Sequence, residues 1–320
     1  MKNLKMTAAA LLLMISAAAF GQSKVYMTKE ITPESLVKIY KALGVEAKGR
    51  VAVKISTGEG GNTHYLKPTL IRQLVDEVNG TIVECNTAYG GSRQDPKKHW
   101  ETIHEHGFDS IFAVDLMDEF GQIRIPIQDK KHLKYDIVGE HLANYNFMIN
   151  LAHFKGHAMG GFGGVMKNAS IGVASTAGKC YIHSAGKTDD PKLAWGPEYL
   201  AAGKTQDSFL ESMAAAAQAV HNYFDGKIIY INVMNNMSVD CDCDGHPAKP
   251  ELKDMGIMAS LDPVALDQAC LDKVFNYQGK PGDDNKPLIQ RINRQHGTYI
   301  TDYAEQIGLG SKKYVLINID

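Results

Sequence analysis

Hydrophobic residues along this chain follow two alternating periodicities. Short runs rich in β-branched residues are separated by longer segments in which apolar residues recur every three or four positions. The short runs predict strands over 51–55, 81–85, 110–114, 147–151, 227–233, 256–260 and 314–319, and the longer segments predict helices over 67–79, 96–106, 208–224, 263–275 and 286–295. This alternation is typical of an α/β fold in which helices flank a mostly parallel sheet.

Capping residues mark the starts of two of these helices. Ser208, followed three residues later by Glu211, predicts a capping box at the start of the helix over 208–224. Asp262 directly before Pro263 predicts an N-cap and a first helical position, because aspartate accepts hydrogen bonds from exposed N–H groups and proline needs no acceptor for its own nitrogen.

The first 21 residues carry a separate pattern. Lys2 and Lys5 precede an apolar stretch over 8–20, and the small residues Ala19 and Gly21 stand at its end. This pattern predicts a secretory signal peptide over 1–21 and a chain over 22–320 that is periplasmic or secreted. The apolar stretch is shorter than the roughly 20 residues of a membrane helix, and no later run reaches that length, so we expect no membrane association after cleavage.

Charge bears on the partners of the chain, and length bears on its domain organisation. Without the predicted leader the chain carries 32 basic and 36 acidic side chains, and this mild acidic balance argues against a nucleic-acid partner. About 300 residues are enough for one large α/β domain or for two lobes. The change to a glycine-rich segment suggests a lobe boundary near residue 150. The sequence leaves the oligomeric state open.

The segment 151–183 is the strongest sign of a binding site. It contains three histidines, three lysines and seven glycines, and no aspartate or glutamate occurs between Glu140 and Asp189. Glycine lets the backbone approach a ligand closely, while ammonium, imidazole and amide groups attract an anion, and imidazole also binds metals. Because the segment follows the strand over 147–151, we expect it at the carboxyl ends of the strands, where ligands bind in open α/β folds. We therefore predict a site for a small anionic ligand there.

A second group of candidate ligands follows the strand over 227–233. The run 240–246 contains Cys241, Cys243 and His246 together with three aspartates. Neighbouring thiols in a Cys-x-Cys pattern form an intramolecular disulfide only with strain, so we expect a soft divalent metal, or disulfides to other cysteines. An exposed acidic turn with incidental cysteines is the alternative. The spacing does not identify the metal.

Five motifs are spread in order between residues 51 and 272. They are Phe-Lys-Gly-His over 154–157, Gly-Val-Met-Lys-Asn over 164–168, Lys179 with His183, Asp-Cys-Asp-Cys over 240–243 and Asp-Pro-Val-Ala-Leu-Asp over 262–267. In this combination the chain resembles the family called domain of unknown function 362, whose members are often named iron-sulphur centre proteins. Many relatives carry repeated Cys-x-x-Cys spacing, which this chain lacks, so we expect no iron–sulphur cluster of that kind.

The spacing of His157, Lys167 and His183 also resembles the central motif of nickel-dependent lactate racemases. That resemblance implies that Lys167 holds a pincer cofactor, that His183 ligates the metal and that His157 carries a proton. The triplet Lys-Pro-Thr over 67–69 is similar to a substrate-binding triplet of those enzymes. In the run Gly-Gly-Ser-Arg over 90–93, serine stands where the racemases have a second histidine, and because serine is a poor base the reaction stays open.

Three functions follow from these observations. The first is an exported metal-dependent enzyme, an isomerase or an oxidoreductase, that acts on a small hydroxy-acid-like anion. The second is a periplasmic metal or anion binding protein without turnover, and the third is a redox protein with a mononuclear metal or iron–sulphur centre on Cys241 and Cys243. The candidate residues are His157 and Lys167 for catalysis; His183, Cys241, Cys243 and His246 for a divalent transition metal; and His64, Lys67, Arg93, Lys155 and Asn168 for the substrate.

Overall fold

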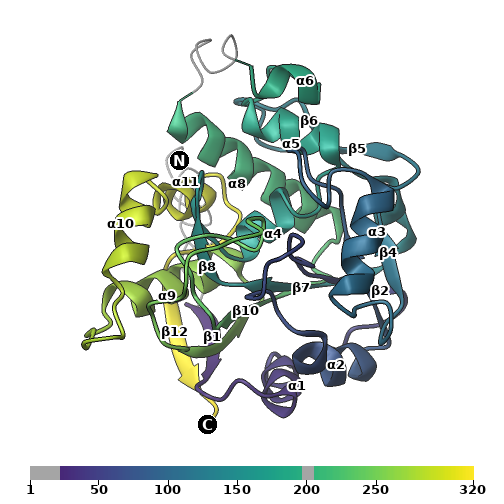
Figure 1. The fold of residues 1–320 in the computed structure, drawn as a ribbon. Coiled ribbons are helices and arrows are strands. Elements are labelled where there is room, and N and C mark those ends of the chain that lie inside the picture. The colour runs from purple at the N-terminus through teal and green to yellow at the C-terminus, as the bar shows by residue number, and fades with distance from the viewer. Residues whose placement is uncertain (1–21, 197–204) are drawn as a thin grey trace, which may run out of the picture.

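An eight-stranded sheet forms the centre of the molecule (Figure 1). The computed structural model describes residues 22–196 and 205–320, so the predicted signal peptide over 1–21 lies outside the described residues. In order across the sheet, the strands are β12 (Tyr314–Asn318), β1 (Ser23–Thr28), β11 (Gly256–Ser260), β10 (Ile228–Met234), β7 (Phe147–His153), β2 (Val51–Lys54), β3 (Gly80–Glu84) and β4 (Val114–Leu116). All neighbours from β10 to β4 pair in parallel, whereas β11 runs antiparallel to both β10 and β1. The predicted α/β fold with a mostly parallel sheet is confirmed.

Helices cover both faces of this sheet. The helices are α1 (Pro33–Ala42), α2 (Pro68–Glu77), α3 (Pro96–Glu105), α4 (Val165–Ser170), α5 (Thr176–His183), α6 (Pro191–Ala194), α8 (Gln206–Tyr223), α9 (Pro263–Phe275), α10 (Lys286–Arg294) and α11 (Tyr299–Gln306), with a 3-10 turn, η1, at Glu140–Asn144. Residues of α1, α2 and α3 belong to one core cluster, and residues of α4, α8 and α9 belong to the other. Of the helices within 22–196 and 205–320, none is both long and apolar enough to cross a membrane.

Two small hairpins complete the fold of residues 22–196 and 205–320. Strands β5 (Gln122–Pro126) and β6 (Tyr135–Gly139) form one antiparallel pair, and β8 (Lys155–His157) and β9 (Gly161–Gly163) form the other. The second hairpin is made by the glycine-rich segment directly after β7. It therefore carries part of the predicted binding segment beyond the carboxyl edge of the main sheet.

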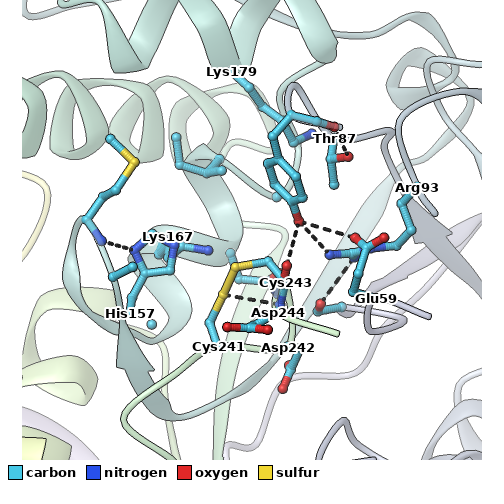
Figure 2. Close-up of a pocket in the computed structure, with 18 of the residues that line it drawn as sticks. Glu59, Thr87, Arg93, His157, Lys167, Lys179, Cys241, Asp242, Cys243 and Asp244 are labelled. Atoms are coloured by element: carbon cyan, nitrogen blue, oxygen red, sulfur yellow. Dashed lines mark hydrogen bonds and ion pairs between the residues drawn. A yellow bond between two sulfur atoms is a disulfide. The ribbon is translucent and has the colours of Figure 1, made fainter. Parts of the chain in front are cut away.

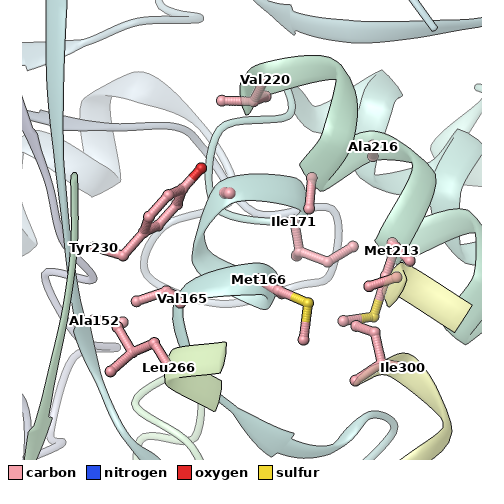
Figure 3. Packing of buried hydrophobic residues seen from close by; sticks show 14 of the residues in the cluster. Ala152, Val165, Met166, Ile171, Met213, Ala216, Val220, Tyr230, Leu266 and Ile300 are labelled. Atoms are coloured by element: carbon pink, nitrogen blue, oxygen red, sulfur yellow. The ribbon is translucent and has the colours of Figure 1, made fainter. Parts of the chain in front are cut away.

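Strand β7 shows why the central strands form nearly continuous apolar runs in the sequence. Met148 and Ala152 belong to the core cluster of α4, α8 and α9, while Ile149 and Leu151 belong to the cluster of α1 and α2. A strand that is covered on both faces needs apolar residues at consecutive positions. Figure 3 shows the first cluster, in which side chains of α4, α8, α9 and α11 pack together.

The structure differs from the predicted elements in two details. The strand predicted over 110–114 is wrong, because residues 110–113 form a turn and β4 begins at Val114. The capping box of α8 consists of Thr205 and Ser208 instead of Ser208 and Glu211, since the helix begins at Gln206. The lobe boundary suggested near residue 150 coincides with the middle of β7, and a division into lobes stays a prediction.

Candidate functional site

A cavity of about 420 Å³ lies at the carboxyl ends of the four neighbouring parallel strands β2, β3, β7 and β10. Its walls come from the ends of these strands and the segments that follow them, within 54–59, 84–93, 152–172 and 240–245, with further residues from α5 and with Trp195. Parallel strands bring such segments together because their carboxyl ends share one edge of the sheet. The cavity lies at the edge that the sequence predicted.

Most of the candidate residues from the sequence line this cavity. Eight of the eleven do so: Arg93, Lys155, His157, Lys167, Asn168, His183, Cys241 and Cys243. Figure 2 labels five of these, Arg93, His157, Lys167, Cys241 and Cys243. Three do not. His246 is exposed, His64 is half-buried outside the lining, and the Lys67 ammonium lies 3.7 Å from the centroid of the Tyr65 ring. The structure thus brings the predicted catalytic pair and the two cysteines together, and the roles of these residues stay predictions.

Close contacts with neighbouring groups require glycine at two positions of the segment 151–183. A Cβ on Gly156 would lie 2.2 Å from the carbonyl oxygen of Val239, and a Cβ on Gly164 would lie 2.3 Å from Oδ1 of Asp267. The first contact lets β8 lie directly against the segment that carries the two cysteines. The second lets a buried carboxylate reach the first turn of α4, the helix that carries Lys167. Both glycines permit close approach of other groups.

The backbone of its own turn holds the imidazole of His157. Its Nδ1 accepts hydrogen bonds from the N–H groups of Met159 (3.2 Å) and Gly160 (2.8 Å). In the neutral ring the proton is therefore on Nε2, because Nδ1 already acts as an acceptor. Burial, together with the nearby charges of Lys167 and His183, holds the pKa of His157 well below its usual value. Near pH 7 the ring is neutral and offers an N–H donor.

Lys167 carries a buried amine that has no carboxylate partner among residues 22–196 and 205–320. Its side chain and that of Lys155 both pass close to Gly163, on the cavity wall. Burial, and next the repulsion from Lys155, lowers the pKa of Lys167 to about 7. A large fraction of this amine is neutral at pH 7, so it can accept a proton or act as a nucleophile.

Two other cations at the cavity are paired with buried carboxylates. The Lys54 ammonium lies 2.6 Å from Glu84 Oε2. The Arg93 guanidinium lies 3.4 Å from Glu59 and 3.5 Å from Glu84. Buried charges require such partners, because leaving one of them unpaired costs several kcal/mol. These contacts fix the positions of both cations on the cavity wall.

Asp242 links the two sequence motifs of the site. Its carboxylate accepts hydrogen bonds from Nδ1 of His153 at 2.8 Å and from Nζ of Lys155 at 2.7 Å. Burial alone would raise the pKa of this carboxyl, but His153 and Lys155 hold it well below its usual range. The aspartate between the two cysteines therefore turns toward β7 and β8.

A disulfide joins Cys241 to Cys243, so the expectation that these thiols would not pair with each other is wrong. The turn around Asp242 brings the two Cα atoms to 5.1 Å, within the range that a disulfide spans. The donor atoms of His157, Cys241 and Cys243 lie within 4.8 Å of one another. This group has the ligand types for a soft divalent metal when the sulfurs are thiolates. It contains His157 in place of the predicted His183 and His246.

A family model described as Domain of unknown function (DUF362) matches residues 51–272. The chain belongs to this family. The match covers all four strands that border the cavity, as well as every residue that lines it. The resemblance that the motifs indicated is therefore confirmed, and the cavity is part of the DUF362 domain itself.

Two solved structures are distantly similar to this DUF362 chain. The lactate racemase apoprotein from Thermoanaerobacterium thermosaccharolyticum is 15% identical, with 66% of this chain and 50% of that chain covered and a TM-score of 0.37. A protein from Thermotoga maritima is 11% identical, with 87% of this chain and 59% of that chain covered and a TM-score of 0.41. The chain thus spans between half and three fifths of the length of these proteins. None of the curated proteins matches it.

Sequence reasoning missed several residues of the DUF362 cavity. Lys54, Glu59, Glu84, Tyr89 and Lys179 all line it but were not among the candidates. A usable signal was present for two of them, since Lys54 and Glu84 are charged residues within or at the end of strands that are otherwise apolar. Such a residue in a buried strand requires a charged partner, and here the two are partners of each other.

Proposed function

We propose that this chain is an enzyme that acts on a small anionic substrate of hydroxy-acid type and that requires a divalent transition metal. The main support is Lys167, which lines the cavity and whose amine has no carboxylate partner among the described residues. In contrast, Lys54, Arg93 and Lys155 are each paired with at least one carboxylate. When Lys167 is protonated, the carboxylate of a substrate would provide the missing counter-charge.

His157 and Lys167 together favour proton transfer as the chemistry of this enzyme. His157 offers an N–H donor from a neutral ring, and the Lys167 amine, with its pKa of about 7, accepts a proton near neutral pH. The Lys167 amine is therefore suited to remove a proton from the substrate, and the His157 N–H to stabilise by a hydrogen bond the negative charge that develops on a substrate oxygen. An isomerase or an oxidoreductase acting on a hydroxy acid requires such a pair.

The proposed metal fits the donor set only when the cysteines are reduced. Disulfide sulfurs are not thiolates, and thiolates are the form that binds metals. In the reduced chain the thiolates of Cys241 and Cys243 would hold the ion, with His157 beside them as the N–H donor. Bound there, the ion would supply a Lewis acid that polarises a substrate oxygen.

We also propose that the enzyme works in the periplasm or outside the cell. The support is the basic and apolar pattern of residues 1–21 with small residues at its end. Mass spectrometry of the protein from an expressing culture tests this assignment. A chain that begins at Gln22 in the exported fraction supports it, and a full-length chain confined to the cytoplasm contradicts it.

Hydrogen exchange on candidate substrates tests the enzymatic proposal. The reduced protein, supplied with zinc, cobalt, nickel or manganese, is incubated with a panel of 2-hydroxy acids in D₂O, and loss of the α-hydrogen signal is followed by NMR. We expect exchange that falls by about 100-fold or more in Lys167→Gln and His157→Gln. Lys130→Gln, at an exposed position, is the matched control and keeps the full rate.

Two outcomes of that experiment contradict the proposal. If Lys167→Gln exchanges as fast as the unmodified protein, Lys167 has no role in the chemistry. If every acid binds, by calorimetry, but none exchanges or is oxidised with any metal, the chain is a binding protein without turnover.

A further inference from the structure

We propose that the Cys241–Cys243 disulfide is a redox-active centre that exchanges with small anionic thiols inside the cavity. Cys243 is the sulfur that is attacked, and Cys241 is the sulfur that leaves as a thiolate. This activity is separate from the proposed function, although both use the same cavity. It rests on the placement of the disulfide, on the groups around each sulfur and on the charge of the cavity wall.

The placement of the disulfide favours a chemical role over a structural one. Both cysteines line the cavity, and Figure 2 shows their sulfurs beside Lys167 and His157. The bridge joins residues only two positions apart. Because the stabilisation from a disulfide grows with the length of the loop that it closes, this bridge stabilises the fold less than a longer one would. A bridge that adds little stability and borders a cavity is available for chemistry.

The surroundings of the two sulfurs differ in a way that sets their roles. Cys241 is 4% exposed, and its Sγ accepts a hydrogen bond from the backbone N–H of Cys243 at 3.2 Å. A nitrogen of His157 lies within 4.8 Å of both sulfurs. Cys243 is half-buried, so an incoming thiol reaches its sulfur more easily. A leaving thiolate is stabilised by donors already in place, which assigns Cys241 as the leaving group.

The cavity wall selects the charge and the size of the thiol. Lys167 and Lys179 both line the cavity, and the amine of neither is ion-paired with a carboxylate among the described residues; Lys179 donates to the carbonyl oxygen of Ala174. A carboxylate on the thiol would pair with these amines. The volume of about 420 Å³ suits a small molecule, and the burial of Cys241 keeps a folded protein partner away from it. The substrate class is therefore a low-mass thiol that carries a carboxylate.

The exchange balances without any further reactant. The thiolate of the small thiol attacks Sγ of Cys243, the bond between the two cysteine sulfurs breaks, and its electron pair stays on Cys241 as a thiolate. A second small thiolate then attacks the sulfur of the first one in the mixed disulfide and releases Cys243. Two thiols are oxidised to one small disulfide, the protein disulfide is reduced to two cysteines, and the two protons of the thiols end on these cysteines. The reverse sequence reduces a small disulfide.

Single-cysteine variants test the assignment of the two sulfurs. Cys241→Ser and Cys243→Ser are incubated, in buffer with a metal chelator, with 3,3′-dithiodipropionate, and adducts are measured by intact-mass spectrometry. We expect Cys241→Ser to accumulate a mixed disulfide on Cys243, because the resolving thiol is absent. Cys243→Ser keeps only the buried thiol of Cys241, and we expect it to react more slowly by about tenfold or more. Equal rates in the two variants would overturn the assignment.

The unmodified protein provides a second test that needs no variant to fold. Its disulfide is reduced at low salt with the anionic thiol 3-mercaptopropionate, the neutral thiol 2-mercaptoethanol or the cationic thiol cysteamine. The free cysteine thiols are then counted after alkylation. We expect the anionic thiol to react about tenfold or more faster, per thiolate, than the cationic one, with this ratio reduced in Lys167→Gln. Rates that do not depend on thiol charge, or that equal those of the urea-unfolded chain, would overturn the proposal. Because no hydroxy acid or metal is present, these results are independent of the exchange experiment above.

Discussion

The carboxylate of Asp267 lies 3.0 Å from the backbone nitrogen of Met166, the residue directly before Lys167. The same carboxylate accepts hydrogen bonds from the N–H of Val165 at 3.0 Å and from the side-chain amide of Asn232 at 2.8 Å. Helix α4 therefore begins on a buried carboxylate that is supplied by α9. The position of the Lys167 amine depends on this contact between two helices.

Removing this carboxylate is expected to disturb both stability and the site. In Asp267→Ala the two N–H groups at the start of α4 lose their acceptor while they stay buried, and each such loss costs about 1–3 kcal/mol. We expect a lower free energy of unfolding in urea and weaker binding of a small carboxylate by calorimetry. Asp76→Ala, at an exposed position, is the control and should change the unfolding free energy by about 0.5 kcal/mol or less. Unchanged stability of Asp267→Ala would show that α4 does not depend on this contact.

Acylation of Lys167 is expected to begin at an unusually low pH. Only the neutral amine reacts, and burial lowers the pKa of Lys167 to about 7, so half of the maximal rate should be reached near that pH. The exposed Lys130 is the reference lysine in the same protein. Peptide mass spectrometry after brief treatment with acetic anhydride at a series of pH values measures both residues in one sample. Parallel pH profiles for the two lysines would contradict the lowered pKa.

Asp136 makes the folded chain less stable as the pH rises. Its side chain is buried, Oδ2 has no partner among the described residues, and burial raises the pKa of this carboxyl from 3.8 to about 7. A carboxyl whose pKa is higher in the folded state contributes most stability below pH 4 and loses that contribution as the pH rises through 7. The difference of about three pH units sets an upper limit of about 4 kcal/mol.

The variant Asp136→Asn isolates this contribution. Asparagine keeps the shape and cannot ionise, so relative to the unmodified protein we expect it to gain stability between pH 4.5 and pH 8. Urea unfolding at these two pH values measures the gain, and the comparison cancels the contributions of all other titrating groups. If the difference in unfolding free energy between the two proteins is the same at both pH values, the pKa of Asp136 is not raised.

A methyl group at Gly156 is expected to separate β8 from the segment that carries the cysteines. The new Cβ would lie 2.2 Å from a backbone carbonyl, which cannot move without its whole segment. We expect Gly156→Ala to lose about 1–3 kcal/mol of unfolding free energy. Gly163→Ala, in the same hairpin, is the matched control, because its Cβ would meet side-chain atoms at ordinary distances of 3.5 Å and more. Equal stabilities of the two variants would count against a tight contact at Gly156.

The sequence predicted the strands that are buried on both faces. Strands β2, β3, β7 and β10 are covered on both faces, so each forms an apolar run that cannot be confused with a surface segment. The hairpin of β8 and β9 was not predicted, because its strands are only three residues long and Phe162 is their one residue of a type enriched in strands. Contacts with α10 and with the cysteine segment hold that hairpin in place.

The sequence predicted only those parts of the candidate site whose residues lie close together along the chain. The histidines and lysines of the segment 151–183 lie close together in sequence, so their meeting in one cavity could be expected. The pairing of Cys241 with Cys243 could not, because it depends on Asp242 turning toward His153 and Lys155, almost 90 positions earlier. The same holds for Lys54 and Glu84, which come from two different strands.

The walls of the cavity come from stretches of chain as far apart as Lys54 and Gly245, and they meet only when β2, β7 and β10 have paired. No fragment shorter than residues 54–245 holds the complete wall, so a molecule that fills this cavity recognises the folded domain. By mass action such a molecule raises the melting temperature of the protein. A thermal-shift screen of small carboxylates and thiols can therefore rank ligands before any reaction is known.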